Sequence, residues 1–307
     1  MSSSSDRKNT SNRTPALGIP GEFFYDPKTF HVTPEHRASW SWNGYVILRN
    51  LFDAEEVSIL RETMEADEAI SKNAMSRQDG SQGQIRLSMW SHPANDAFGM
   101  AARCYKVAGT IEKLMDVDEI YHYHTKLILK DQETGGAFQW HQDYGYWYKN
   151  STIFPGDMGT VFIPVDPCRK ENGCLKVIPG SHRMGRVDHV RIGEQVMADP
   201  QRIAWAEEKL GPAIDVEMNP GDALFFHSCL LHSSGQNRSH LRRWVLITTY
   251  NSRRNDPIVP HHHASYTPLV KVANDKVKDI GVVRESLDRD YNKSANDKSI
   301  HDDEEEK

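Results

Sequence analysis

Apolar positions follow two different periods along this chain, helical in the first third and strand-like in the remainder. Thr33 followed by Pro34 is typical of a helix start. Asp53 with Glu56 three residues later has the spacing of a capping box. The apolar positions that continue at helical spacing are Val57, Leu60 and Met64. A further helical stretch is expected over residues 95–115, and a short apolar strand over residues 45–48.

Short apolar runs bounded by turn residues dominate the rest of the chain. Strands are expected at residues 120–130, 159–165, 174–178, 213–218, 223–227 and 243–250. Turn sequences such as Asn219-Pro220-Gly221-Asp222 separate them. Many short strands after a helical N-terminal part predict a mainly β protein with flanking helices, built on a jelly-roll barrel.

The two ends of the chain are polar and lack apolar periodicity. We expect residues 1–20 and residues 286–307 to be disordered, the latter as an acidic tail. No linker composition interrupts the middle of the 307-residue chain, so residues 25–285 are expected to form one domain.

Charge and cysteine usage narrow the class of protein. The net charge is -6, and the last six residues contribute -4 of it through five acids and one base, so the rest is nearly neutral and no nucleic-acid partner is expected. No apolar run reaches about 18 residues, which argues against a membrane span. Four cysteines without a CxxC pair favour a reduced, cytoplasmic setting, with peroxisome and mitochondrion left open. Nothing in the sequence marks an obligate protein partner.

Candidate chemistry centres on the stretch FQWHQDYGYWY at residues 138–148. On an extended strand His141 and Asp143 point to the same face and could bind one ion. Two histidines and one carboxylate form the facial triad of non-haem iron oxygenases. Taken alone, the pair also fits a hydrogen-bonded histidine on a half-buried strand. His227 and His232 are candidates for the third ligand, and on a strand they would face opposite ways, so only one is expected to reach the ion.

Arg242 and Arg243 stand at the start of an apolar strand. An inward-pointing guanidinium needs an anion. A carboxylate cosubstrate would match its bidentate geometry, and a structural acid of the protein would serve equally well.

Together these motifs resemble the phytanoyl-CoA dioxygenase family of Fe(II)/2-oxoglutarate dioxygenases, which includes ectoine hydroxylases. The resemblance covers about residues 35–255. It rests on HQD at 141–143, ENGCL…PGSH at 171–182, and PGD…FFH…LLHSSGQNRS at 220–239, followed by an arginine. It implies a double-stranded β-helix core, an Fe(II) cofactor, and 2-oxoglutarate and O2 as cosubstrates.

The resemblance also assigns roles to residues. The implied metal ligands are His141, Asp143 and His232, which makes His227 a core or supporting residue. Arg243, eleven residues after the distal histidine, would bind 2-oxoglutarate. Positions near the cosubstrate are Ser234, Lys126 and Phe162.

The implied reaction is hydroxylation of a C–H bond in a small-molecule substrate, with release of succinate and CO2. Relatives that halogenate lack the carboxylate, so Asp143 implies oxygenation. An acyl-CoA or another lipid-derived carboxylate is an alternative substrate. A non-catalytic metal-binding barrel, acting as a sensor or scaffold, is the alternative outside enzymes.

Aromatic residues suggest a substrate pocket. Ectoine hydroxylases also have a tryptophan six residues after the first histidine, which corresponds to Trp147. Tyr144, Tyr146 and, from the helical part, Trp90 are the other candidates. Such rings can hold a cationic molecule, or they can simply pack a loop over the barrel, as we expect for at least two rings in residues 144–148. Residues 261–263, three histidines, are expected to be an exposed loop.

Overall fold

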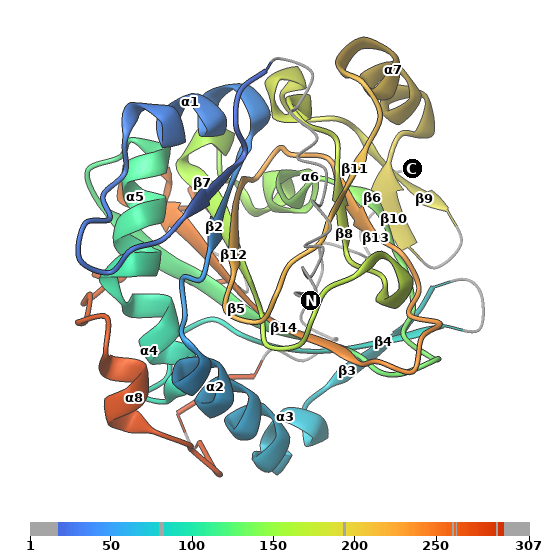
Figure 1. Cartoon of the computed structure of the whole chain (residues 1–307). Helices are drawn as coiled ribbons and strands as arrows, with labels where there is room; N and C mark the ends of the chain where they lie inside the picture. The colour runs from blue at the N-terminus through green and yellow to red at the C-terminus, as the bar shows by residue number, and fades with distance from the viewer. Residues whose placement is uncertain are drawn as a thin grey trace, which may run out of the picture.

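Two sheets face each other across a shared core in the computed structural model, which describes residues 18–79, 83–192, 195–259, 261, 263–286 and 288–291 (Figure 1). The larger sheet has the strand order β1-β2-β12-β7-β14-β5-β4-β3, and the smaller has the order β11-β8-β13-β6. The larger sheet contains β1 (Glu22–Phe24), β2 (Tyr45–Arg49), β3 (Met75–Gln78), β4 (Gln84–Trp90), β5 (Ile120–Lys130), β7 (Met158–Pro164), β12 (Ala223–His227) and β14 (Arg243–Ser252). The smaller contains β6 (Phe138–His141), β8 (Leu175–Val177), β11 (Ile214–Val216) and β13 (His232–Ser234).

Helices cover the outer face of the larger sheet. They are α1 (Pro34–Asn43), α2 (Ala54–Ala66), α3 (Glu68–Lys72), α4 (Ala97–Arg103), α5 (Thr110–Met115) and α8 (Lys276–Ile280). Next to the smaller sheet lie α6 (Asp143–Trp147), α7 (Pro200–Leu210) and the ribbon of β9 (His189–Ile192) and β10 (Gln195–Ala198). The layers place the barrel interior between the two sheets.

Side-chain alternation along the central strands separates two hydrophobic cores. On β5, Leu127 and Leu129 pack outward against the helices, whereas Ile128 packs inward. On β14, Leu246 faces the helices and Val245 faces the smaller sheet. Because β5 is covered on both sides, nearly all of its residues are buried, the polar ones included.

The predicted fold class is confirmed, with differences at the level of elements. The helix starts at Pro34 and at the Asp53–Glu56 capping box both occur, with Asp53 accepting from the amide of Glu56. The helix expected over residues 95–115 is interrupted, because Cys104 adopts an extended conformation and a π-turn, Tyr105–Gly109, follows it. The strands expected at residues 174–178 and 213–218 are shorter, as β8 and β11.

The packed part of the chain continues past residue 285. Arg289 is buried and bridges Asp67 and Asp96, which cap the N-termini of α3 and α4. The other predicted disordered segments, residues 1–17 and 292–307, lie outside the described residues. Within the described part of the chain, every helix is too short or too polar to cross a lipid bilayer.

Candidate active site

Three side chains meet where β6 and β13 pair. His141 ends β6 and lies opposite His232, the first residue of β13, with ring centroids 4.1 Å apart. Asp143 Oδ1 lies 4.0 Å from His232 Nε2. One potential ligand atom from each of the three residues lies within 4.8 Å of the other two. This donor set fits a divalent metal such as Fe(II).

The local path of the chain differs from the single strand that the sequence suggested. The strand ends at His141, extended Gln142 follows, and Asp143 begins α6. Gln142 is locked in place, because its side-chain amide donates to the carbonyl groups of Gly185 and Cys229 and accepts from the amide of Val187. The two ligand residues therefore converge through a rigid strand-to-helix turn.

Backbone carbonyl groups fix the tautomers of both histidines. His141 Nδ1 lies 2.7 Å from the carbonyl oxygen of Gln139, and His232 Nδ1 lies 2.9 Å from that of Leu230. A carbonyl can only accept, so each Nδ1 carries the proton and each Nε2 presents a lone pair. Burial, and next the neighbouring His232, hold the pKa of His141 well below its usual range, which keeps the ring neutral and ready to bind a metal.

Asp143 is oriented by one hydroxyl group. Thr160 Oγ1 on β7 donates to Asp143 Oδ2 at 2.8 Å, and Thr249 Oγ1 lies 3.3 Å from the same hydroxyl. Asp143 Oδ1 remains directed at His232. The carboxylate can thus offer one oxygen to a metal while the other is held by the barrel wall.

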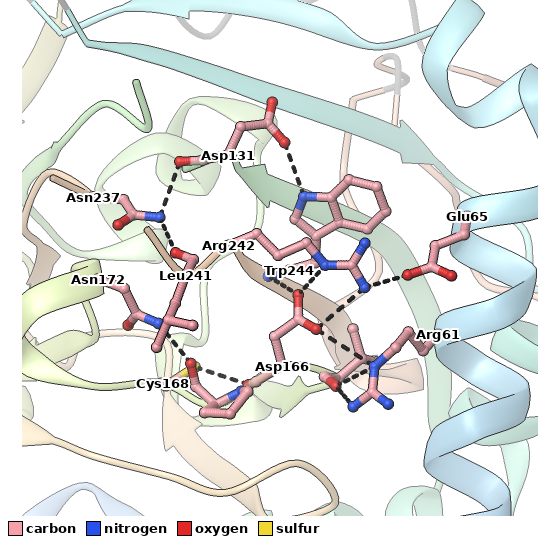
Figure 2. A network of polar contacts seen from close by, with 12 residues as sticks. Arg61, Glu65, Asp131, Asp166, Cys168, Asn172, Asn237, Leu241, Arg242 and Trp244 are labelled. Carbon is pink, nitrogen blue, oxygen red and sulfur yellow. Dashed lines mark hydrogen bonds and ion pairs between the residues drawn. The ribbon is translucent and has the colours of Figure 1, made fainter. Parts of the chain in front are cut away.

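The two consecutive arginines have opposite environments. Arg242 is bound on the outside by Asp166, at 2.9 Å, and by Glu65 (Figure 2). Arg243 is 1% exposed, lines the cavity between the sheets, and has no hydrogen bond or ion pair to any described residue. The Cys168 and Cys174 thiols are among its titratable neighbours, and burial raises their pKa values to about 12. A buried cation without a protein anion is a site for an anionic ligand.

A second buried cation, Lys130, lies beside Arg243 and was missed at the sequence level. The two residues are partners across β5 and β14. Lys130 Nζ donates to Ser234 Oγ at 2.8 Å and also to the carbonyl oxygen of Gly235. Ser234 Oγ therefore accepts from the lysine and can donate its own hydrogen into the cavity. Lys130 shares a strand face with the predicted Lys126 at a spacing of four, which was the available signal.

The other candidate residues divide into two groups. One cavity is lined by Arg243 and by the candidate metal triad, which is His141, Asp143 and His232. Four other candidates line the same cavity: Lys126, Phe162, Trp147 and Tyr146. Tyr144 is not among the residues that line the cavity; it packs behind Trp147 in an aromatic cluster, and its hydroxyl donates to the carbonyl oxygen of Thr152 at 2.9 Å.

Trp90 also lies away from the cavity. The preceding residue of β4, Met89, lines the cavity, so alternation turns Trp90 to the opposite face of the sheet. There it contacts Phe98, Tyr291 and the Arg289 guanidinium. We therefore withdraw it as a substrate contact.

Two histidine predictions have different outcomes. His227 packs against Trp40 and His182, away from the triad, as expected of a core residue. The exposed loop expected at residues 261–263 is wrong for His263, which is 8% exposed, stacks on Tyr123 at 4.7 Å and lines the cavity. His262 lies outside the described residues.

Comparison with known proteins gives a consistent family. The model of the phytanoyl-CoA dioxygenase family matches residues 40–245. L-proline trans-4-hydroxylase of Streptomyces griseoviridis is 28% identical, over 76% of this chain and 94% of its own length. Ectoine dioxygenase of Stutzerimonas stutzeri is 24% identical, over 78% of this chain and 83% of its own length.

Solved structures agree on the fold. EctD from S. alaskensis with 2-oxoglutarate and 5-hydroxyectoine superposes with a TM-score of 0.65 at 20% identity, covering 87% of this chain and 96% of that one. The family match spans well over half of the chain and includes the metal triad and Arg243. The chain therefore belongs to the phytanoyl-CoA dioxygenase family of Fe(II)- and 2-oxoglutarate-dependent dioxygenases.

Proposed function

We propose that this dioxygenase hydroxylates a small zwitterionic substrate, one with a carboxylate and a protonated amine, of the kind that amino acids and their cyclic derivatives provide. Iron would bind to His141, Asp143 and His232. The observation that carries this part of the proposal is the convergence of the three potential ligand atoms within 4.8 Å, with both histidine tautomers set for binding. Fe(II) supplies the activation of O2 that amino-acid side chains cannot provide.

The cosubstrate would lie between the metal triad and Arg243. Its far carboxylate would pair with the Arg243 guanidinium, which has no protein partner among the described residues, and would accept from Ser234. Lys130 would support this contact through its hydrogen bond to Ser234. Phe162, whose ring centroid lies 5.8 Å from the Arg243 guanidinium, would exclude water from the chain of the cosubstrate.

The substrate would occupy the remaining part of the cavity. Its lining there combines the Lys126 ammonium group, the Trp147 ring, Tyr146 and His263. A cation can bind a carboxylate, and an indole ring attracts a protonated amine. Tyr146 is held by a hydrogen bond from its hydroxyl to the carbonyl oxygen of Val196 at 2.6 Å, so its ring forms a fixed wall. The relatives named for L-proline and ectoine support a small substrate of this type.

The test is a substrate panel scored by product formation together with succinate release. The panel contains cyclic and linear amino acids, their methyl esters, their N-acetyl derivatives, and acyl-CoAs, with Fe(II), 2-oxoglutarate and O2 supplied. We expect stimulation of succinate release by free amino acids and loss of it with the ester or the N-acetyl group. Turnover of acyl-CoAs in preference to every amino acid would contradict the substrate class.

Two variants complete this experiment. Asp143→Ala should abolish turnover of whichever substrate is found, since it removes a proposed iron ligand. Lys126→Met should raise KM for the free acid and narrow the difference between the acid and its methyl ester. Ester discrimination that survives Lys126→Met would show that Lys126 does not contact the substrate carboxylate.

A further inference from the structure

Within the described part of the chain, Arg243 has no hydrogen-bonding or charged side-chain partner, and the Phe162 ring, with its centroid 5.8 Å from the guanidinium, is its aromatic neighbour. Its guanidinium makes no hydrogen bond or ion pair within the described part of the chain, and its Nε is buried. A long, flexible side chain in this state owes its direction to the backbone that carries it. That backbone is held by the pairing of β14 with β5 and β7 and, next to Arg243 itself, by the contacts of its two sequence neighbours, Arg242 and Trp244.

One carboxylate, that of Asp166, binds both neighbours. It accepts from Arg242 Nε at 2.9 Å and from the backbone amide of Trp244 at 3.0 Å (Figure 2). The backbone amide of Asp166 in turn donates to the carbonyl oxygen of Trp244, at 3.4 Å. Asp166 is 6% exposed, and Arg61 also lies 3.4 Å from it, so its negative charge is compensated outside the barrel.

A second acid fixes the Trp244 side chain. Trp244 Nε1 donates to Asp131 Oδ1 at 3.1 Å, and Asp131 follows the last residue of β5 directly. The Arg242 guanidinium stacks 4.3 Å from the centre of the Trp244 ring. Figure 2 shows Asp131 bound to the Trp244 indole, and Asp166 and Glu65 bound to the Arg242 guanidinium. The two outward-facing residues around Arg243 are thus held at several points.

Two consecutive arginines at the start of β14, Arg242 just before it and Arg243 as its first residue, create an ambiguity of register. A slip of one residue would turn Arg242 into the barrel and Arg243 out of it. The acids resolve this ambiguity, because Asp166 and Glu65 both lie on the outer side, whereas Asp143, at the metal triad, is the one carboxylate among the residues that line the cavity.

We propose that Asp166 is a positioning residue for cosubstrate binding: by holding Arg242 and the Trp244 amide it selects Arg243 as the inward, anion-binding arginine and fixes its direction. This inference rests on the proposed role of Arg243 in binding 2-oxoglutarate. Asp166 touches neither cosubstrate nor metal, and its effect passes entirely through the backbone of β14.

The test compares two cosubstrates on the Fe(II) enzyme without O2, by the absorbance band that forms when a 2-oxo acid chelates the iron. One is 2-oxoglutarate; the other is 2-oxopentanoate, which chelates in the same way but lacks the far carboxylate. Asp166→Ala should weaken 2-oxoglutarate binding roughly tenfold and change 2-oxopentanoate binding by less than about twofold. Asp166→Asn should have an affinity for 2-oxoglutarate between those of wild type and Asp166→Ala, because the asparagine amide oxygen still accepts from the Trp244 amide. If the alanine variant does not fold, the asparagine variant is used for the test.

Glu65→Gln is the matched control, since Glu65 also pairs with Arg242 but makes no contact with the Trp244 backbone. It should leave both dissociation constants near wild type. The positioning role would be overturned if Asp166→Asn weakened the binding of both 2-oxo acids equally. It would also be overturned if Glu65→Gln weakened 2-oxoglutarate binding as much as Asp166→Asn does.

Arg243→Met separates this inference from the proposed function. If Arg243→Met keeps the wild-type preference for 2-oxoglutarate over 2-oxopentanoate, the cosubstrate site itself is wrongly assigned. If Arg243→Met removes that preference while Asp166→Asn leaves it intact, only the role of Asp166 fails.

Discussion

Two buried cations of neighbouring strands, Lys130 and Arg243, lie side by side: Arg243 lines the cavity, and Lys130 contacts the cavity residue Ser234. Burial, and next the charge of Arg243, hold the pKa of Lys130 well below its usual range. Each cation disfavours the other, so part of the binding energy of a dicarboxylate at the proposed site would come from relief of this repulsion.

Replacement of Lys130 by methionine should weaken 2-oxoglutarate binding by about tenfold and leave kcat at saturating cosubstrate nearly unchanged. Lys130→Met removes the donor to Ser234 Oγ, so Ser234→Ala should add little in that background. The measurement is the KM for 2-oxoglutarate in the two single variants and the double variant. Lys271→Met, which removes a lysine paired with Glu112 in the helical layer, is the control. If the effects of Lys130→Met and Ser234→Ala on this KM were fully additive, the two residues would not act together in cosubstrate binding.

The residues that an ordered motif pointed to, His141, Asp143, His232 and Arg243, lie around one cavity in the structure. The triad and Arg243 were anticipated because their spacing is shared with a family. The sequence did not indicate that Trp90 faces the helices or that Lys130 lies beside Arg243, and the reason is physical. Whether a strand residue faces the cavity or the helices depends on the register of its partners, as Met89 and Trp90 illustrate, and a single sequence does not contain that register.

At the scale of elements, long apolar strands were predictable and short polar ones were not. β5 and β12 match the expected ranges, since apolar runs bounded by turns indicate buried strands. β13, with the sequence His232-Ser233-Ser234, has no strand-like pattern. It forms because β6 and β8 pair with it on both sides, an effect of tertiary context.

The helical layer is joined to the π-turn by one buried ion pair. Lys106 Nζ lies 2.5 Å from Glu56 Oε1, and both side chains are about 5% exposed or less. Lys106→Met leaves the Glu56 charge buried without its partner, and we expect a loss of about 3 kcal/mol in the free energy of unfolding. Urea unfolding of the single variant and of the Lys106→Met/Glu56→Gln double variant measures it. The double variant should recover part of the lost free energy of unfolding, because it removes the unpaired charge. If the single and double variants were equally stable, the buried Glu56 charge would not be the cause of the loss.

For the whole molecule, buried histidines outside the active site, His122 and His182 among them, predict an acid-sensitive fold. Burial lowers the pKa values of His122 and His182 to about 4 from the ordinary 6.5. Both rings are neutral in the folded protein, so the unfolded chain binds more protons between these values. The free energy of unfolding should be highest above about pH 6.5. It should fall as the pH drops toward 4, by up to about 3 kcal/mol for each histidine.

Urea unfolding at a series of pH values between 4 and 7 measures this slope. His122→Gln and His182→Gln should each flatten it, because glutamine does not titrate. His240→Gln, at an exposed position beside Glu133, should leave the slope unchanged. A wild-type stability that is flat over this range would show that the two buried rings do not control acid unfolding.

The most direct test of the account is an anaerobic titration of the apoprotein with Fe(II) and then 2-oxoglutarate, followed by visible absorbance. We predict one iron per chain and a weak absorbance band on addition of 2-oxoglutarate. His232→Ala should abolish the band and His227→Ala should retain it. A band that persists in His232→Ala but disappears in His227→Ala would contradict the assignment of the iron to His141, Asp143 and His232.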